Sequence, residues 1–248
     1  MRVLIVSDLH ANWPALEALR EPHDVCLCLG DLVDYGCDPA PVIDWVRRHV
    51  HACVRGNHDH MVAQYVTTNG YSGFRYLSGV TRPVSQQRIE AEHRRFLADL
   101  PLTRFLTLGG KRFLLVHATP RDPLDEYAAA DVDFWKRRIA GLGVDVVCVG
   151  HTHQPYVLQV EGTTIINPGS VGLPRDGDPR LSYAVWEDGR VTLHRAEYDV
   201  EQAVRRIQEA DLPDQAKEML ACVLRHGSLH NGSQRTAPAP ASNGTHSR

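Results

Sequence analysis

Five short clusters in the sequence contain aspartate, asparagine and histidine, whose oxygen and nitrogen atoms are common ligands of manganese, iron and zinc. The clusters are Asp8-Leu9-His10, Gly30-Asp31, Gly56-Asn57-His58-Asp59, His117 and Gly150-His151-Thr152-His153. One such cluster by itself is more often a helix cap, a turn or a hydrogen-bonded histidine. Five of them, each at the end of an apolar segment, favour a shared metal site, because joint context is what supports a motif.

The segments before the clusters have the pattern of buried strands. Short apolar runs that end in polar residues are typical of strands covered on both faces. These runs lie at Val3–Val6, Val25–Leu29, Ala52–Arg55, Phe113–Val116 and Val144–Val149. In open α/β sheets, sites form beyond the carboxyl ends of the strands. The polar clusters stand at these ends, and glycine before Asp31, Asn57 and His151 permits tight turns and close backbone approach.

The remaining elements alternate between helix and hairpin signals. Asn12 can cap a helix that has Pro14 in its first turn. Further helices are predicted at Pro41–Val50, Ser85–Leu97, Val132–Ala140, Val200–Ala210 and Asp214–Arg225, and strands at Phe105–Leu108, Tyr156–Val160, Thr163–Ile166, Tyr183–Trp186 and Val191–His194. The stretch Thr67–Gly79 lacks a period and predicts a loop or lid near the site.

The composition is that of an ordinary globular protein. The chain has 248 residues, 43% hydrophobic and 23% charged, and its formal net charge is −3. This charge makes nucleic acid an unlikely partner, since nucleic-acid-binding domains are usually basic. No apolar run reaches the roughly 18 residues that cross a bilayer, and Val3–Val6 is too short for a signal peptide. A cytoplasmic protein without a membrane partner is therefore expected.

The six cysteines are interpreted as small buried hydrophobes. Cys26 and Cys28 could bind a metal, but no second cysteine pair completes such a site. The C-terminal region from Gly227 is rich in Ser, Asn, Gly, Ala and Pro. We therefore expect one domain over residues 1–226 and a disordered tail over residues 227–248.

Taken in order, the clusters resemble the motifs of the calcineurin-like metallophosphoesterase family. The family pattern is Asp-x-His, Gly-Asp, Gly-Asn-His-Asp/Glu, a lone His and Gly-His-x-His, and this sequence contains all five between Asp8 and His153. The resemblance covers about residues 1–200 and is greatest to small stand-alone prokaryotic phosphodiesterases and diadenosine-tetraphosphatase-like proteins. It implies an α/β fold, a four-layer α-β-β-α sandwich with two mixed β-sheets flanked by helices.

The resemblance also implies a site for two divalent metal ions, manganese, iron or zinc, with manganese the first choice in vitro. Asp8, His10, Asp31 and His153 would hold one ion. Asp31, Asn57, His117 and His151 would hold the other, so that Asp31 bridges the two. Two ions about 3.5–4 Å apart can activate water and clamp a phosphoryl group.

The family suggests that His58 acts as the acid–base residue and that Asp34, three residues after the bridging aspartate, orients it. Related protein phosphatases have arginine at the next position, where this chain has Tyr35. This difference weakens the case for phosphoprotein substrates.

Phosphate contacts are sought among arginines, because a guanidinium binds phosphate as a fork. Arg55, Arg82, Arg121 and Arg175 are candidates, and Arg121 and Arg175 are preferred because they lie in Pro/Gly-rich loops. Each could equally be a solvated surface residue.

The sequence thus predicts a metal-dependent phosphomonoesterase or phosphodiesterase that acts on nucleotides or other small molecules. The alternative is a catalytically silent binding or scaffold protein on the same fold. The presence of His58 favours the enzyme. Substrate identity, metal identity and oligomeric state stay open.

Overall fold

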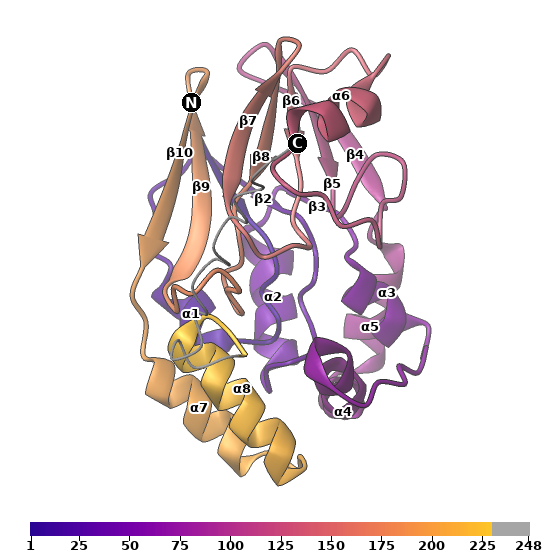
Figure 1. Cartoon of the computed structure of the whole chain (residues 1–248), viewed down its shortest axis with the longest axis vertical. Helices are drawn as coiled ribbons and strands as arrows, with labels where there is room; N and C mark the ends of the chain where they lie inside the picture. Colours follow the sequence, from indigo (N-terminus) through magenta and orange to yellow (C-terminus); the bar gives the residue numbers. More distant parts are fainter. Residues whose placement is uncertain (230–248) are drawn as a thin grey trace, which may run out of the picture.

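The computed structural model describes residues 1–229, and their strands form two five-stranded sheets (Figure 1). Sheet A has the strand order β10-β9-β1-β2-β3 and sheet B has the order β4-β5-β6-β8-β7. The strands of sheet A are β1 (Arg2–Val6), β2 (Val25–Cys28), β3 (Ala52–Cys53), β9 (Leu181–Glu187) and β10 (Arg190–Ala196). Those of sheet B are β4 (Thr103–Leu108), β5 (Lys111–Val116), β6 (Val146–Cys148), β7 (Tyr156–Val160) and β8 (Thr163–Asn167).

Both sheets are mixed, with a parallel centre. Strands β1, β2 and β3 are parallel, whereas β9 and β10 are antiparallel additions at one side. In sheet B, β5, β6 and β8 are parallel and the outer strands β4 and β7 are antiparallel. Parallel strands end at the same edge of a sheet. The segments that follow β1, β2, β3, β5 and β6 therefore leave from the same end of the two sheets.

Side chains alternate along the central strands and so fill two different cores. Val3 and Ile5 of β1 point into the space between the sheets, where Phe113 and Trp186 meet edge to face at 5.3 Å. Leu4 of the same strand points to the helices on the other face of sheet A. This period of two is what a pleated strand covered on both sides produces.

Helices cover the two outer faces, which completes the predicted α-β-β-α layers. The helices are α1 (Trp13–Ala18), α2 (Pro39–His49), α3 (Asn57–Ala63), α4 (Gly73–Arg88), α5 (Ala91–Asp99), α6 (Val132–Ile139), α7 (Val200–Glu209) and α8 (Asp214–His226). Leu16 of α1, Ile43 of α2 and Leu97 of α5 pack on sheet A. Trp135 of α6, fully buried, packs on the outer face of sheet B.

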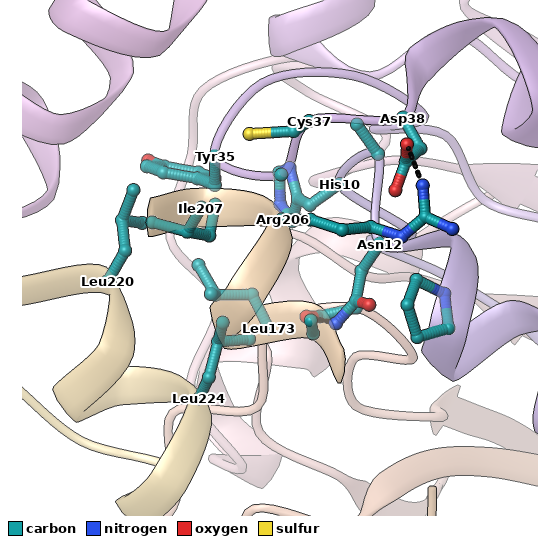
Figure 2. Close-up of a pocket in the computed structure, with 15 residues that line it drawn as sticks. His10, Asn12, Tyr35, Cys37, Asp38, Leu173, Arg206, Ile207, Leu220 and Leu224 are labelled. Carbon is teal, nitrogen blue, oxygen red and sulfur yellow. Dashed lines mark hydrogen bonds and ion pairs between the residues drawn. The ribbon is translucent and has the colours of Figure 1, made fainter. Parts of the chain in front are cut away.

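The helical pair α7–α8 packs against α1 and α4 at one end of the molecule (Figure 1). Figure 2 shows part of this contact: Ile207 of α7, Leu220 and Leu224 of α8, Tyr35, Leu173 and His10 line one small pocket. The pair α7–α8 therefore packs against the segments that carry His10 and Tyr35.

One predicted region is wrong. The sequence predicted a loop over Thr67–Gly79 and one helix over Ser85–Leu97, but α4 already begins at Gly73 and a break at Ile89-Glu90 separates it from α5. The polar motif that begins at Asn57 also forms a helix, α3, which was not expected. The other predicted elements are confirmed, with ends that differ by at most two residues.

The C-terminal prediction is covered only in part. Gly227 ends α8 with a left-handed backbone, and its carbonyl accepts a hydrogen bond from the Gly177 N–H. The rest of the expected disordered tail, residues 230–248, lies outside the described residues. Within the described part of the chain, no helix is both long and apolar enough to cross a membrane.

Candidate metal centre

The clustered residues lie on loops with unusual backbone geometry. Eight non-glycine residues around the site have positive φ, a conformation that strains an L-residue. They are Asp8, His10, Ala11, Asp31, Asp34, Tyr35, His151 and His153. Such strain persists only where the surrounding structure fixes it, and it concentrates at functional sites. The loops after β1, β2 and β6 are therefore built to point these side chains at one place.

Two glycines permit the close packing of these loops, as the sequence predicted. A Cβ on Gly56 would lie 2.0 Å from Oδ1 of Asp31, and one on Gly150 would lie 1.9 Å from Oγ of Ser7. No side chain fits at either position. The loops after β3 and β6 therefore pass directly against those after β2 and β1.

One group of ligand atoms gathers around Asp8, His10 and His153, all buried. Nε2 of His153 lies 3.3 Å from Oδ1 of Asp8 and 3.2 Å from Nε2 of His10. A second group gathers around Asp31, His117 and His151, also buried. These two groups are the size of single metal sites, since each set of ligand atoms lies within 4.8 Å.

Asp31 lies between the two groups. Its Oδ2 is 3.2 Å from Nε2 of His117 in the second group and 3.8 Å from Nε2 of His10 in the first. Oδ1 of Asn57 is 3.1 Å from the same atom of His117. The structure thus brings together all seven residues that the sequence proposed as ligands, with Asp31 in the position of a bridge.

Backbone carbonyls fix the orientation of the histidines. A carbonyl can only accept, so Nδ1 of His10, His117 and His153 must donate, to Val33 (2.9 Å), Leu29 (2.7 Å) and Leu173 (2.5 Å). The proton on Nδ1 leaves a lone pair on Nε2 of the neutral ring. Metal-binding histidines are usually held in this way.

Two buried ligand atoms have no hydrogen-bond partner within the described residues: Oδ1 of Asp8 and Nε2 of His151. Each belongs to a different one of the two groups. A buried polar atom without a partner is costly, and a cation in each group would give both atoms one. The donor set of carboxylate, amide oxygen and imidazole therefore fits two divalent ions.

The electrostatics of the site also favour cations. Burial lowers the pKa of His10 and His153 well below the usual value and that of His151 to about 3, so these rings are neutral, the form that binds metal. Burial opposes charge on His117 as well, but the Asp31 carboxylate raises its pKa to about 10. The carboxylates thus attract positive charge to Nε2 of His117, which a metal ion can supply instead of a proton.

His58 and Asp34 form a pair beside the two groups. Nδ1 of His58 lies 2.8 Å from Oδ2 of Asp34, and Nε2 of His58 lies 4.0 Å from Oδ2 of Asp31. The buried Asp34 therefore holds one side of the ring while the other side faces the ligand cluster. The family resemblance led us to expect that Asp34 orients His58; the two side chains are in contact, and their role in proton transfer stays a prediction.

The sequence analysis assigned no role to Asp59, which is fully buried on α3. Its carboxylate accepts hydrogen bonds from the backbone N–H groups of Asp31 (2.8 Å), Leu32 (2.8 Å) and Gly56 (3.0 Å). Asp59 therefore ties the loop after β2 to the loop after β3. Its place as the last residue of the Gly-Asn-His-Asp motif was the available signal.

The four arginine candidates have different surroundings. Arg175 lines the cleft above the site, which has a volume of about 490 Å³, and its guanidinium lies 3.7 Å from the centre of the Phe74 ring. Arg121 is exposed and is not among the residues that line this cleft. Arg55 instead donates to the carbonyls of Ala98 and Leu100 at the end of α5. The fourth, Arg82, is buried.

Tyr127 is a cleft residue that the sequence analysis missed. Tyr127 is 62% exposed, its ring lies 4.3 Å from the ring of His151, and it lines the cleft together with Phe74. It lies in the segment between β5 and α6, where no pattern in the sequence distinguished it.

The model of the calcineurin-like phosphoesterase superfamily domain matches residues 1–188. The chain belongs to this superfamily. An uncharacterised protein of Methanocaldococcus jannaschii, MJ0912, is 30% identical over 243 residues, which cover 88% of this chain and 96% of that protein. The crystal structure of a metallophosphoesterase from Sphaerobacter thermophilus is 33% identical, covers 92% of this chain and all of that one (100%), and superimposes with a TM-score of 0.75.

Other solved structures share the fold of this metallophosphoesterase domain. The hypothetical protein PH1004 from Pyrococcus horikoshii has a TM-score of 0.80 at 19% identity and covers 92% of this chain and 98% of its own. A putative diadenosine tetraphosphatase has a TM-score of 0.52 at 23% identity, with 79% and 94% of the two chains covered. Membership of the superfamily implies a phosphoester substrate, and the two buried His/Asp groups are consistent with its dinuclear metal site.

Proposed function

We propose that this protein is a hydrolase of phosphomonoesters or phosphodiesters, on nucleotides or other small molecules, that requires two divalent metal ions. The observation that carries the proposal is the position of His58 Nε2, 4.0 Å from the bridging Asp31 carboxylate, next to two complete groups of ligand atoms. Such a cluster combines the means to bind a phosphoryl group with a group that can move a proton.

The metal ions would be held by the residues that the sequence proposed. Asp8, His10 and His153 would bind one ion, His117, His151 and Asn57 the other, and Asp31 both. When bound, the ions supply Lewis-acid stabilisation of the phosphoryl oxygens, and they lower the pKa of a water so that it can lose a proton and attack phosphorus. Manganese is our choice for assays, while iron and zinc suit the same ligands.

His58 is assigned the proton transfer. In the doubly protonated ring, Nδ1 of His58 donates to Asp34, and Nε2 of His58 is the atom that would give its proton to the leaving oxygen. As the phosphorus–oxygen bond of the ester breaks, the water oxygen forms the new bond to phosphorus. One proton of that water, passed through solvent, restores His58, so the net reaction adds one water across the ester.

Arg175 is proposed to bind the substrate phosphate. Its guanidinium packs against Phe74 and lies 5.3 Å from the centre of the Tyr35 ring, and Nε has no hydrogen-bond partner in the described structure. Aromatic faces hold a guanidinium in place without using its N–H donors. The donors stay available for phosphate oxygens. Arg121 remains a second prediction, although it is exposed and does not line the cleft in this structure.

The first test is turnover by manganese-loaded protein of p-nitrophenyl phosphate, bis-p-nitrophenyl phosphate and a dinucleoside tetraphosphate. We expect activity that a chelator abolishes and that His58→Ala reduces about a hundredfold or more, as for loss of a general acid. His60→Ala is the matched control, because His60 lies on the same helix but contacts Arg55. Metal binding without turnover of any substrate would contradict the proposal and favour the scaffold alternative.

A further inference from the structure

The inner face of α4 is polar and holds the loop that carries Asp34. Ser85 Oγ accepts a hydrogen bond from the Asp34 N–H (3.0 Å), and Thr81 Oγ1 accepts one from the Tyr35 N–H (2.9 Å). Asp34 and Tyr35 have positive φ values of 65° and 61°. These two hydrogen bonds therefore stabilise a strained turn next to the metal ligands.

Arg82 lies on the same face and binds the Asp34 side chain. Its Nε and Nη2 donate to Oδ2 of Asp34 at 3.0 and 2.7 Å, and the arginine is only 2% exposed. The same oxygen accepts the Nδ1 proton of His58 at 2.8 Å. One oxygen of Asp34 thus accepts hydrogen bonds from both His58 and Arg82, and Nη2 of Arg82 lies 3.5 Å from Nδ1 of His58.

Arg82 also binds the wall of the cleft. Its Nη1 donates to the carbonyl of Val66 at 3.3 Å and to the hydroxyl of Thr68. Both residues lie in the segment between α3 and α4, and both line the cleft above the metal site. One guanidinium therefore connects a loop that substrate would contact with the carboxylate that orients His58.

The sequence made Arg82 a candidate phosphate contact, but the N–H donors of its guanidinium already bind protein acceptors. Nε, Nη1 and Nη2 all have protein acceptors, so phosphate could be bound only by breaking a buried ion pair. Removing one partner of such a pair is strongly destabilising locally, because the other charge is left buried. The contacts thus assign Arg82 a structural relation to Asp34 in place of contact with substrate.

We propose that Arg82 is a positioning residue for proton transfer: it fixes Asp34, and through Asp34 the ring of His58, and it ties this pair to the cleft loop at Val66–Thr68. The inference rests on the proposed hydrolase function for its kinetic consequence. Arginine suits the position because its planar fork can bind Asp34 with two atoms while a third reaches the loop. A lysine ammonium cannot make this set of contacts.

Leaving-group dependence separates positioning from general damage. A p-nitrophenolate leaves readily without a proton, whereas an alkoxide such as a ribose oxygen needs one. We expect Arg82→Met to reduce kcat about 10- to 100-fold on an alkyl or nucleoside ester, the range for residues that orient a functional group. The loss of kcat on the p-nitrophenyl ester should be several times smaller. The kcat of Arg82→Lys on the alkyl ester should lie between those of the parent protein and Arg82→Met. Equal losses on both esters would overturn the proposal.

The path through His58 is tested by combining substitutions. If Arg82 acts only by way of Asp34 and His58, Arg82→Met should have little further effect on kcat in a His58→Ala background. Independent, multiplicative losses would contradict this. Arg88→Met is the matched control, because Arg88 is an exposed arginine on the same helix that donates to the Cys37 carbonyl and, within the described residues, does not bind Asp34. It should keep the kcat of the parent protein.

A further readout needs no turnover and so separates failure of this inference from failure of the proposed function. In metal-loaded protein, hydrogen–deuterium exchange of residues 65–72 should be faster in Arg82→Met than in the parent or in Arg88→Met. Bound metal, measured in parallel, should stay at the parent level in all three. Unchanged exchange in Arg82→Met would refute the tie between Arg82 and the cleft loop even if every assay for hydrolysis were negative.

Discussion

Nε2 of His10 and Nε2 of His153 lie 3.2 Å apart, and neither ring has a proton to place between them. Each Nδ1 donates its proton to a carbonyl, that of Val33 for His10 and that of Leu173 for His153. Burial also lowers the pKa of both rings well below the usual value, so neither ring takes up a second proton. Two lone pairs therefore face each other in a buried place, an arrangement that a shared cation would stabilise.

We therefore predict that His153→Ala lowers bound metal from about two ions per chain towards one, because it removes a ligand from only one of the two groups. Metal analysis of protein dialysed with manganese measures this directly. His194→Ala provides the control, because His194 lies on β10, stacks on Tyr183 and belongs to neither group of ligand atoms. This variant should bind as much metal as the parent. Two ions in His153→Ala would mean that His153 is not needed to hold a metal in the first group.

The positions of the ligands could be predicted because they depend on strand ends. An apolar run such as Val3–Val6 shows where a strand ends, and parallel strands bring their ends together. The family resemblance implied that Asp31 stands between the two groups, but no pattern in the residues themselves showed it. That position depends on the left-handed turns at Asp31 and Asp34 and on the three backbone hydrogen bonds to Asp59.

Helix α4 was missed for a physical reason. The side chains that it buries include Ser78, Thr81, Arg82 and Ser85, which bind backbone and carboxylate groups and give no apolar period. Gly73, Gly79 and Pro83 further lower its helix propensity. Hydrophobic periodicity finds helices that pack on a core, and this one packs largely on a polar loop.

The sequence likewise did not determine the roles of the arginines. Arg82 and Arg175 both line the cleft, but the guanidinium of Arg82 binds Asp34, whereas Nε of Arg175 has no protein acceptor within the described residues. Only the contacts distinguish them.

Arg175→Met should weaken substrate binding, because it removes the cleft guanidinium while keeping most of the packing on Phe74. We expect KM to rise about tenfold, the change for loss of a charge-assisted hydrogen bond of roughly 1.5 kcal/mol. Steady-state kinetics on a phosphomonoester give the value. Arg121→Met is the comparison, and a larger rise in KM there than in Arg175→Met would reverse our assignment of the phosphate contact.

The stability contributed by Glu126 should depend on pH. Hydrogen bonds from Arg138, and also from Thr119, lower the pKa of this carboxyl from 4.5 to about 2. A carboxyl with a lowered folded-state pKa stabilises the fold above its unfolded pKa and loses that contribution as the pH falls through the folded value. Glu126→Gln should therefore lower Tm by a few degrees at pH 7, and the difference should shrink between about pH 4.5 and 2.

Thermal unfolding followed at a series of pH values tests this prediction. Arg121 is the other charged group that acts on this carboxyl, so Arg121→Met should reduce the pH dependence only slightly. A Tm difference that stays constant from pH 7 to pH 2 would show that Glu126 contributes through packing and not through its charge.

Gly56→Ala should damage the metal site more than the fold. The new Cβ would lie 2.0 Å from Oδ1 of Asp31 and 2.5 Å from the Asp31 backbone nitrogen. The Asp31 carboxylate would therefore have to leave its present position between the two groups of ligand atoms. Because Asp31 belongs to both, we expect metal affinity to fall at least about 10- to 100-fold, as when a residue that orients a ligand is lost. Titration with manganese, followed by calorimetry, measures the change.

Gly162→Ala is the matched control. Gly162 lies in the β7–β8 turn, where a new Cβ would meet open space, and its φ of 85° makes alanine strained there as well. It should lower Tm modestly and bind metal normally, whereas parent-like affinity in Gly56→Ala would show that Asp31 does not hold the metal in the position described.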